Sequence, residues 1–338
     1  MKDLRNYSLK PHNTFGMEAK ASRFMEYANI EDAQKIASVL RTEQDPYLII
    51  GSGSNLLLTS DFEGVVVHSA IKGIKKLSCE DGSTLIRCGS GELWDDVVAW
   101  CVGEGFGHLV NLSLIPGEVG ASVVQNIGAY GSEVSEFVAS IEAVEIATGE
   151  VVTIAPDDCD YGYRKSKFKT VWKNKYLITA VEYRLLPFTE LNVEYGNIRA
   201  ELERKGITRP TADELRQTII AIRQAKLPDP AIEGNAGSFF MNPIVPREKY
   251  EELAALYEGM PHYDVDEEHV KIPAGWMIEQ CGWKGKSLGR AGVHAKQALV
   301  LVNRGGATGD EVVRLCEAIR HDVKEKFGIE IFPEVNIV

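Results

Sequence analysis

Three short segments of this chain carry the polar residues best suited to chemistry. Residues 161–169 (YGYRKSKFK) are locally basic in an acidic protein, and Arg164 among them presents a planar fork that matches a carboxylate. Residues 234–243 (GNAGSFFMNP) set Ser238 in a glycine-flanked turn, which differs from the Gly-x-Ser-x-Gly elbow of hydrolases. Glu334 is an isolated acid close to the last residue. Taken singly, these features also fit a solvated charged face, a packed turn and an exposed carboxylate.

Two glycine-rich stretches are candidates for ligand loops. Residues 51–55 (GSGSN) lack the third glycine of the dinucleotide fingerprint, because Leu56 stands there, and they fit a tight turn as well as a diphosphate loop. Residues 115–131 (IPGEVGASVVQNIGAYG) contain four glycines, and their small side chains leave the backbone uncovered. A plain connecting loop is rarely so long and apolar, so we expect this stretch to wrap a flat polar ligand.

Composition and charge exclude several classes of function. The 338 residues carry a formal net charge of −12, which disfavours nucleic-acid binding. No apolar run reaches the roughly 18 residues that a membrane span needs, and the first residues lack the apolar core of a signal peptide, so we expect a cytoplasmic protein. The six cysteines and seven histidines show no metal-ligand spacing. We therefore expect reduced thiols and no metal.

The elements that position these segments can be read from hydrophobic spacing. Helices are expected over residues 30–40 (capped by Asn29), 93–102, 213–225, 247–257 and 310–327. Strands are expected over residues 47–50, 56–58, 65–67, 141–146, 151–154, 176–186, 298–302 and 329–338. Hairpin turns fall at 79–83 and 148–149, and Pro187 ends the strand before it. A domain boundary is predicted at the proline-rich residues 227–230.

The ordered set of segments resembles the UDP-N-acetylenolpyruvoylglucosamine reductases, the flavoenzymes that complete UDP-N-acetylmuramate for bacterial cell walls. The matching pieces span nearly the whole chain: residues 13–16 (NTFG), 51–55, 115–131, 161–168, 226–243 and Glu334. Tyr195-Gly196 and Tyr263 resemble the longer, type I subtype of that family.

The resemblance implies an α+β flavoprotein of three domains, with an FAD-binding fold of the vanillyl-alcohol-oxidase and p-cresol-methylhydroxylase type. The first FAD-binding subdomain would comprise residues 1–70 and 322–338, and the second residues 71–225. A C-terminal substrate-binding α+β domain would span residues 226–321. We also expect a monomer with no nucleic-acid or membrane partner.

The resemblance further implies a reaction and catalytic roles. NADPH would reduce non-covalently bound FAD and leave, and UDP-N-acetylglucosamine enolpyruvate would then be reduced to UDP-N-acetylmuramate. Hydride would pass from flavin N5 to C3 of the enolpyruvyl group, and Ser238 would protonate C2. Arg164 would polarise the carboxylate with help from Glu334. Because a carboxylate anion would repel an enolate, Glu334 must be protonated or paired with a cation such as Lys226, and both options stay open.

The family's binding residues carry over onto matching positions. Those implied to hold FAD are Gly51, Ser52, Gly53, Ser54, Asn55, Leu56, Ile115, Pro116, Gly117, Val119, Gly120, Ala121, Ser122, Gln125, Asn126, Gly128, Ala129, Ile178 and Arg223. Those implied to hold the substrate are Tyr130, Tyr163, Tyr195, Lys226, Asn242, Tyr263, Lys284 and Gln297. Lysine and tyrosine suit a diphosphate, whereas asparagine and glutamine suit the edges of uracil.

Two other functions are compatible with parts of the pattern. An FAD oxidase of the same fold, acting on a sugar or a hydroxy acid, would share the flavin loops without needing Ser238 and Glu334. A non-catalytic nucleotide-sugar binder would lack the flavin altogether. The colour of the purified protein and its electron acceptor distinguish these alternatives from the reductase.

Overall fold

The computed structural model describes residues 1–78, 81–186 and 190–338, which form two compact units. The first unit comprises residues 1–7, 21–52 and 62–225, and the second comprises residues 8–20, 53–61 and 226–338. The expected division into three domains is finer than these two units and stays a prediction. The expected turn at 79–83 lies partly, and Pro187 wholly, outside the described residues.

The first unit contains a four-stranded sheet that leads into the first glycine-rich segment. Its order is β1-β2-β5-β3, with strands Lys2–Ser8, Lys20–Tyr27, Phe62–Ser69 and Tyr47–Ile50. The strands β2, β5 and β3 run parallel. Helix α1 (Ile30–Glu43) begins as expected after Asn29, whose side chain accepts a hydrogen bond from the backbone N–H of Asp32 at 2.8 Å.

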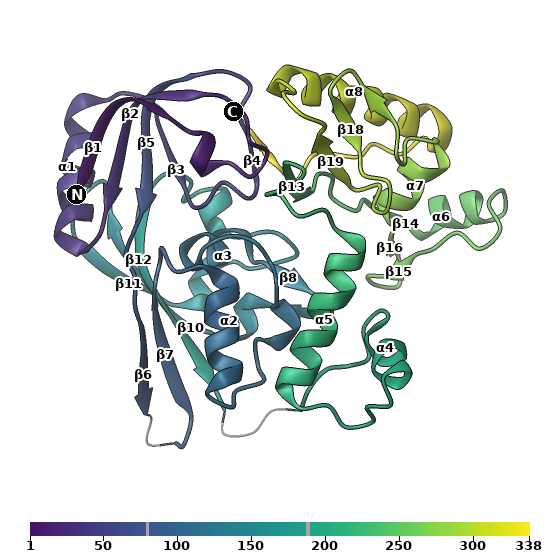
Figure 1. The fold of residues 1–338 in the computed structure, drawn as a ribbon, viewed down its shortest axis with the longest axis horizontal. Coiled ribbons are helices and arrows are strands. Elements are labelled where there is room, and N and C mark those ends of the chain that lie inside the picture. Colours follow the sequence, from purple (N-terminus) through teal and green to yellow (C-terminus); the bar gives the residue numbers. More distant parts are fainter. Residues whose placement is uncertain (79–80, 187–189) are drawn as a thin grey trace. The chain divides into compact units, whose positions relative to one another are not determined.

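A five-stranded antiparallel sheet forms the rest of the first unit's framework (Figure 1). Its order is β11-β10-β12-β7-β6, with strands Val151–Ile154, Val138–Glu145, Tyr176–Leu185, Thr84–Gly89 and Ile74–Ser78. The β10–β11 hairpin confirms the turn expected at 148–149. One face of this sheet packs on α2 (Trp94–Gly103) and α3 (Val119–Gln125), and α1 packs beside the other face through Val144 and Leu177.

The expectation that residues 115–131 form one long loop is wrong. Residues Val119–Gln125 form helix α3, and β8 (Gly128–Ala129) pairs with β9 (Ser132–Glu133) directly after it. Val119 and Val123 stand one helical turn apart and are both fully buried in the core that covers the sheet. The abundance of small residues hid this short apolar stripe.

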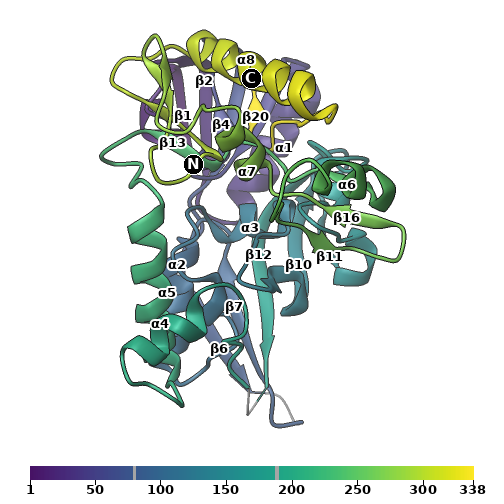
Figure 2. The same cartoon turned by 90° about the vertical axis from the view of Figure 1, so that its right-hand side faces the viewer.

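Two further helices complete the first unit. Helix α4 spans Ile198–Arg204, and α5 spans Ala212–Lys226, which confirms the helix expected before Leu227. Figures 1 and 2 show α5 alongside α2, and Arg216 of α5 joins the two by donating to both carboxylate oxygens of Asp95 at 2.7 and 2.8 Å.

The second unit is built on a four-stranded sheet of order β13-β19-β18-β17. Its strands are Asn235–Ser238, Val300–Asn303, Ala291–Val293 and Ser287–Leu288, and α8 (Gly309–Phe327) packs against it (Figure 2). A smaller sheet, β14-β16-β15, comprises Ile244–Pro246, His269–Lys271 and Tyr263–Asp264. Helices α6 (Arg247–Ala254) and α7 (Ala274–Gln280) complete the unit.

The expected terminal strand is much shorter than residues 329–338. Only β20 (Asn336–Ile337) is a strand, and it pairs in parallel with β4 (Leu56–Leu57). Before it, Pro333 forms only an isolated bridge with Phe240, because proline has no backbone N–H with which to extend the pairing. Within the described residues, the structure contains no helix with both the length and the apolar character of a membrane span.

Candidate active site

Arg164 occupies a tight turn that aims its guanidinium at the second glycine-rich segment. Gly162 and Lys165 exchange backbone hydrogen bonds around it, and Arg164 itself adopts a left-handed conformation with φ of 55°. Its Nη2 donates to the carbonyl of Gly128 at 2.7 Å, and its Nη1 donates to that of Asn126 at 3.4 Å. The main chain after α3 therefore sets the direction of this cation.

Asn126 is the hub that holds this turn in place. Its side chain is completely buried, and its amide nitrogen donates to Glu133 at 2.6 Å and to the carbonyl of Gly162 at 3.0 Å. Its amide oxygen accepts from the backbone N–H of Ser135. Because these bonds use both amide protons, the side chain of Asn126 acts here as support for Arg164, and its contact with FAD stays a prediction.

A second arginine lies close enough to Arg164 to interact with it electrostatically. Burial lowers the pKa of Arg223, on α5, while the neighbouring Tyr130 raises it, with a net lowering. Tyr163 lies against the guanidinium of Arg164, 5.3 Å from the ring centroid. A Cβ at Gly131 would lie 3.1 Å from the ring of Tyr195. The first unit thus brings Arg164, Arg223, Tyr130, Tyr163 and Tyr195 near one another, and their role in binding an anionic ligand stays a prediction.

The two glycine-rich segments meet within the first unit. Gly51 follows β3, and a Cβ built on it would lie 3.2 Å from both the Cβ of Ala121 and the Oε2 of Glu118. A side chain at this position would crowd both atoms, so glycine favours this close approach of the first segment to α3. This contact brings together two segments that lie about 70 positions apart in the sequence.

Two buried polar atoms fit the presence of a bound flavin nucleotide. The hydroxyl oxygen of Ser52 and the Nε of Arg223 are buried without a hydrogen-bond partner among the described residues. Buried polar groups are normally paired, so each of these atoms is available to a ligand. A serine hydroxyl and a guanidinium suit the diphosphate and carbonyl oxygens of FAD, and these residues therefore fit the cofactor.

Other residues expected to contact FAD face the protein core with their side chains. The Ser122 hydroxyl donates to the carbonyl of Val119 at 2.7 Å and lies 3.2 Å from the Tyr183 hydroxyl. Ile178 belongs to the buried cluster under α2 and α3, and its carbonyl accepts a hydrogen bond from Tyr27. The contacts of Ser122 and Ile178 with FAD therefore stay predictions.

In the second unit, backbone pairing places Glu334 next to the serine segment. The N–H of Glu334 donates to the carbonyl of Phe239 at 2.8 Å, and Phe240 and Pro333 form an isolated antiparallel bridge. Ser238 ends β13 beyond a register shift, after Gly237 with φ of 70°. Its side chain is exposed and makes no hydrogen bond to any described residue. Two of the three predicted catalytic residues are therefore neighbours.

The remainder of the first glycine-rich segment supports Glu334. Asn55 donates from its amide to the carbonyl of Glu334 at 3.3 Å, and its own carbonyl accepts from the N–H of Asn336. A Cβ at Gly53 would lie 1.9 Å from the carbonyl oxygen of His12, so this position excludes every other residue. Asn55 thus links the first glycine-rich segment to the C-terminal segment by hydrogen bonds.

The other predicted substrate residues are distributed over the second unit. Asn242 accepts from the backbone N–H of Ala274, where α7 begins, and Gln297 accepts from that of Leu299. Lys284 pairs with Glu279 at 2.9 Å. Tyr263 is half exposed on β15 beside Lys271, and Lys226 ends α5. The contacts of these residues with the substrate stay predictions.

Among the described residues, one cluster of side chains on α8 has metal-ligating atoms close enough together to hold a metal ion. These atoms of His321, Asp322 and Glu325 lie within 4.8 Å of one another. Asp322 accepts a hydrogen bond from Trp283, and His321 and Glu325 are highly exposed. The expectation that the protein binds no metal stays a prediction.

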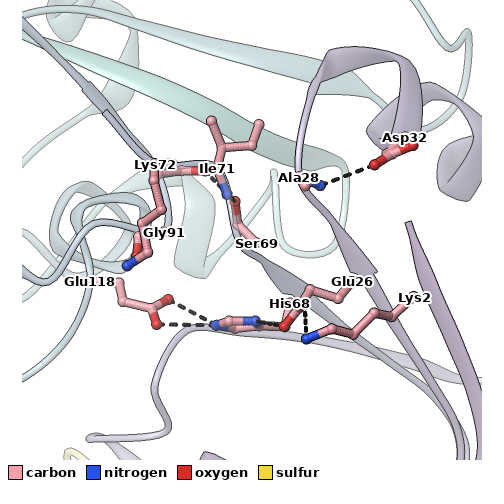
Figure 3. A network of polar contacts seen from close by, with 11 residues as sticks. Lys2, Glu26, Ala28, Asp32, His68, Ser69, Ile71, Lys72, Gly91 and Glu118 are labelled. Atoms are coloured by element: carbon pink, nitrogen blue, oxygen red, sulfur yellow. Dashed lines mark hydrogen bonds and ion pairs between the residues drawn. The ribbon is translucent and has the colours of Figure 1, made fainter. Parts of the chain in front are cut away.

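Sequence reasoning missed a buried ionic network beside the glycine-rich segments (Figure 3). The Nδ1 of His68, on β5, lies 3.0 Å from Glu26, and its Nε2 lies 3.1 Å from Glu118. Lys2 pairs with the far side of Glu26 at 2.6 Å. The signals were a histidine directly after the apolar run 65–67 and a glutamate directly after Gly117, but neither signal identifies its partner.

Comparisons with known proteins define the class of this fold and site. Residues 21–155 match the model of an FAD-binding domain, and residues 229–338 match that of the UDP-N-acetylenolpyruvoylglucosamine reductase C-terminal domain. The fold and the glycine-rich segments are therefore those of an FAD-binding oxidoreductase.

Curated relatives identify the family. A UDP-N-acetylenolpyruvoylglucosamine reductase of Bacteroides fragilis is 51% identical over 335 residues, 99% of each chain, and that of Flavobacterium johnsoniae is 44% identical over 98% of each. A crystal structure of the Thermus caldophilus enzyme has a TM-score of 0.66 at 21% identity, covers 99% of this chain and 98% of its own, and supports the fold. The chain belongs to the UDP-N-acetylenolpyruvoylglucosamine reductase family. The expected family, α+β flavoprotein fold and FAD cofactor are confirmed.

Proposed function

We propose that this chain reduces UDP-N-acetylglucosamine enolpyruvate to UDP-N-acetylmuramate with NADPH as the reductant. The observation that carries the proposal is that the backbone of Glu334 pairs with that of Phe239, the residue after Ser238. The exposed hydroxyl of Ser238 has no hydrogen-bond partner among the described residues. A flavin-binding unit alone fits many oxidoreductases. A serine and an acid held at adjacent backbone positions fit a reaction that needs a proton donor next to a developing negative charge.

The chain's own residues have separable roles in this reaction. Bound FAD would supply the hydride that C3 of the enolpyruvyl group accepts. Arg164 binds the substrate carboxylate and stabilises the negative charge that develops on it. Ser238 gives its hydroxyl proton to C2, and Glu334 assists. Serine is a weak acid, and a carbanion-like C2 is a base strong enough to take its proton.

Binding of the nucleotide portion of the substrate is assigned to residues with matching chemistry. Tyr130, Tyr163 and Tyr195 accompany the two arginines of the first unit, and Lys226 and Lys284 offer cations for the diphosphate. Asn242, Gln297 and Tyr263 are proposed to contact the uridine.

We further infer that the enzyme acts in the cytoplasm as a monomer. Light scattering that gave the mass of a dimer would contradict the monomeric state.

The test is anaerobic rapid mixing. Protein reduced with NADPH is mixed with UDP-N-acetylglucosamine enolpyruvate, and flavin absorbance is followed while mass spectrometry identifies the product. We expect reoxidation coupled to one UDP-N-acetylmuramate per flavin. Reoxidation by oxygen but not by the enolpyruvyl compound would instead favour the oxidase, and a colourless protein that gains no flavin would favour the binder.

The FAD is expected to be held without a covalent link. The known covalent attachments use histidine or cysteine, and neither residue occurs in 51–55 or 115–131. Acid precipitation of the yellow protein should release all the flavin into the supernatant, as absorbance of both fractions would measure. Yellow colour that stays with the washed pellet would contradict this prediction.

A further inference from the structure

His68 stands where the two glycine-rich segments originate. The register of β3 and β5 pairs it with Ile50, the residue directly before Gly51. Its ring nitrogen contacts Glu118, which directly precedes α3. Figure 3 shows the imidazole lying between the carboxylates of Glu118 and Glu26. His68 therefore connects β5 to the first segment through strand pairing and to the second segment through its side chain.

Glu118 is oriented for this contact and not for capping its own helix. It occupies the N-cap position of α3, yet its side chain makes no capping hydrogen bond. Both its carboxylate oxygens lie within 3.2 Å of Nε2 of His68, and Oε2 also approaches Gly51. The ion pair thus fixes the start of α3 against the segment that follows β3.

The network is electrically neutral only when His68 carries a proton. Glu26 and Glu118 supply two negative charges, and both are at least nine-tenths buried. Lys2 supplies one positive charge from an exposed position. Burial lowers the pKa of His68, but Glu118 and then Glu26 outweigh this effect, so the pKa is raised above its ordinary value.

We propose that protonated His68 is a positioning residue for the flavin. Its charge neutralises Glu118, and the ion pair holds the start of α3 against Gly51. The anionic cofactor therefore meets a neutral surface. The inference rests on the proposed placement of FAD at the two glycine-rich segments. Without the imidazolium proton, a buried carboxylate would stand unpaired beside a diphosphate. Removal of one partner from a buried ion pair is costly because the remaining charge is not solvated, and salt screens such a charge poorly.

This arrangement predicts that FAD binds more weakly as the pH rises. The groups facing His68 are Glu26 from β2, Glu118 before α3 and, through Glu26, Lys2 from β1. Phe24 stacks on the ring, and burial raises the pKa of the nearby Tyr27 hydroxyl. Because the pKa of His68 is raised, its proton persists to higher pH than that of an ordinary histidine and is lost as the pH passes through the raised pKa.

The experiment measures FAD release from diluted holoprotein, through the fluorescence of free flavin, from about pH 6 to about pH 10. Wild-type affinity should fall with rising pH. At neutral pH, His68→Asn should bind FAD about tenfold more weakly than the wild type, an effect of the size usual for coupled sites. The FAD affinity of this variant should no longer depend on pH. Adding Glu118→Gln to His68→Asn should restore affinity, because it removes the unpaired charge. The exposed His321→Asn on α8 is the matched control and should behave as wild type.

The outcomes separate this inference from the proposed function. Wild-type affinity that does not change with pH, or a double variant as weak as His68→Asn, would overturn the inference while leaving the reductase reaction intact. If His68→Asn fails to fold, Glu118→Gln alone decides the matter. That variant should bind FAD at least as tightly as wild type and with a flatter pH profile, and weaker binding would contradict the inference. A wild-type protein that takes up no flavin would instead defeat the proposed function.

Discussion

Replacing Ser238 by alanine should leave flavin reduction by NADPH intact and slow reoxidation by the enolpyruvyl substrate about 10²–10⁴-fold, the loss typical of a missing general acid. The first half-reaction needs no proton at substrate C2, whereas the second does. The hydroxyl of Ser238 makes no hydrogen bond to a described residue, so the substitution removes no contact of the fold. Stability and substrate affinity should therefore change little.

Stopped-flow absorbance resolves the two half-reactions, and two further variants sharpen the result. Ser238→Cys retains a proton on a more acidic atom and should recover part of the rate. Ser287→Ala alters an exposed serine on β17 of the same sheet and should have no effect. Near-normal reoxidation in Ser238→Ala would remove the serine from the mechanism and assign the proton to water or to Lys226.

Replacing Arg164 by methionine should slow the same half-reaction by about 10²–10³-fold, as the loss of one oxyanion-stabilising donor does. Arg164 is held by the carbonyls of Gly128 and Asn126, so its charge is positioned before substrate arrives. Arg164→Lys keeps the charge without the planar fork and should recover only part of the rate. Flavin reduction should stay near normal in both variants.

The control for this prediction is another arginine of the first unit. Arg184 on β12 pairs with Asp81 at 3.0 Å, and both side chains are about half exposed, so the pair contributes little. Arg184→Met should leave both half-reactions unchanged. Equal slowing of the two half-reactions in Arg164→Met would point to a disturbed flavin site, and the role in carboxylate recognition would then be rejected.

Much of the fold could be predicted because its signals are local. The spacing of apolar residues and the cap at Asn29 predict α1, and the turn at 148–149 predicts the β10–β11 hairpin. Helix α3 was missed because its stripe consists of only Val119 and Val123 among small residues. The terminal strand was overestimated because a weak alternation continues through Pro333, which forms only an isolated bridge and has no backbone N–H with which to extend it.

The sequence by itself determined the family, the cofactor and the candidate residues, because a long ordered set of motifs is specific even where each motif is weak. Only the tertiary structure decided which of these residues meet within each unit. Backbone pairing, not spacing, places Glu334 beside Phe239. The contact between His68 and Glu118 joins residues 50 positions apart and depends on strand register and burial. Local patterns encode helix and strand periods, but a charge partner across the core depends on how separate segments pack, which no local pattern records.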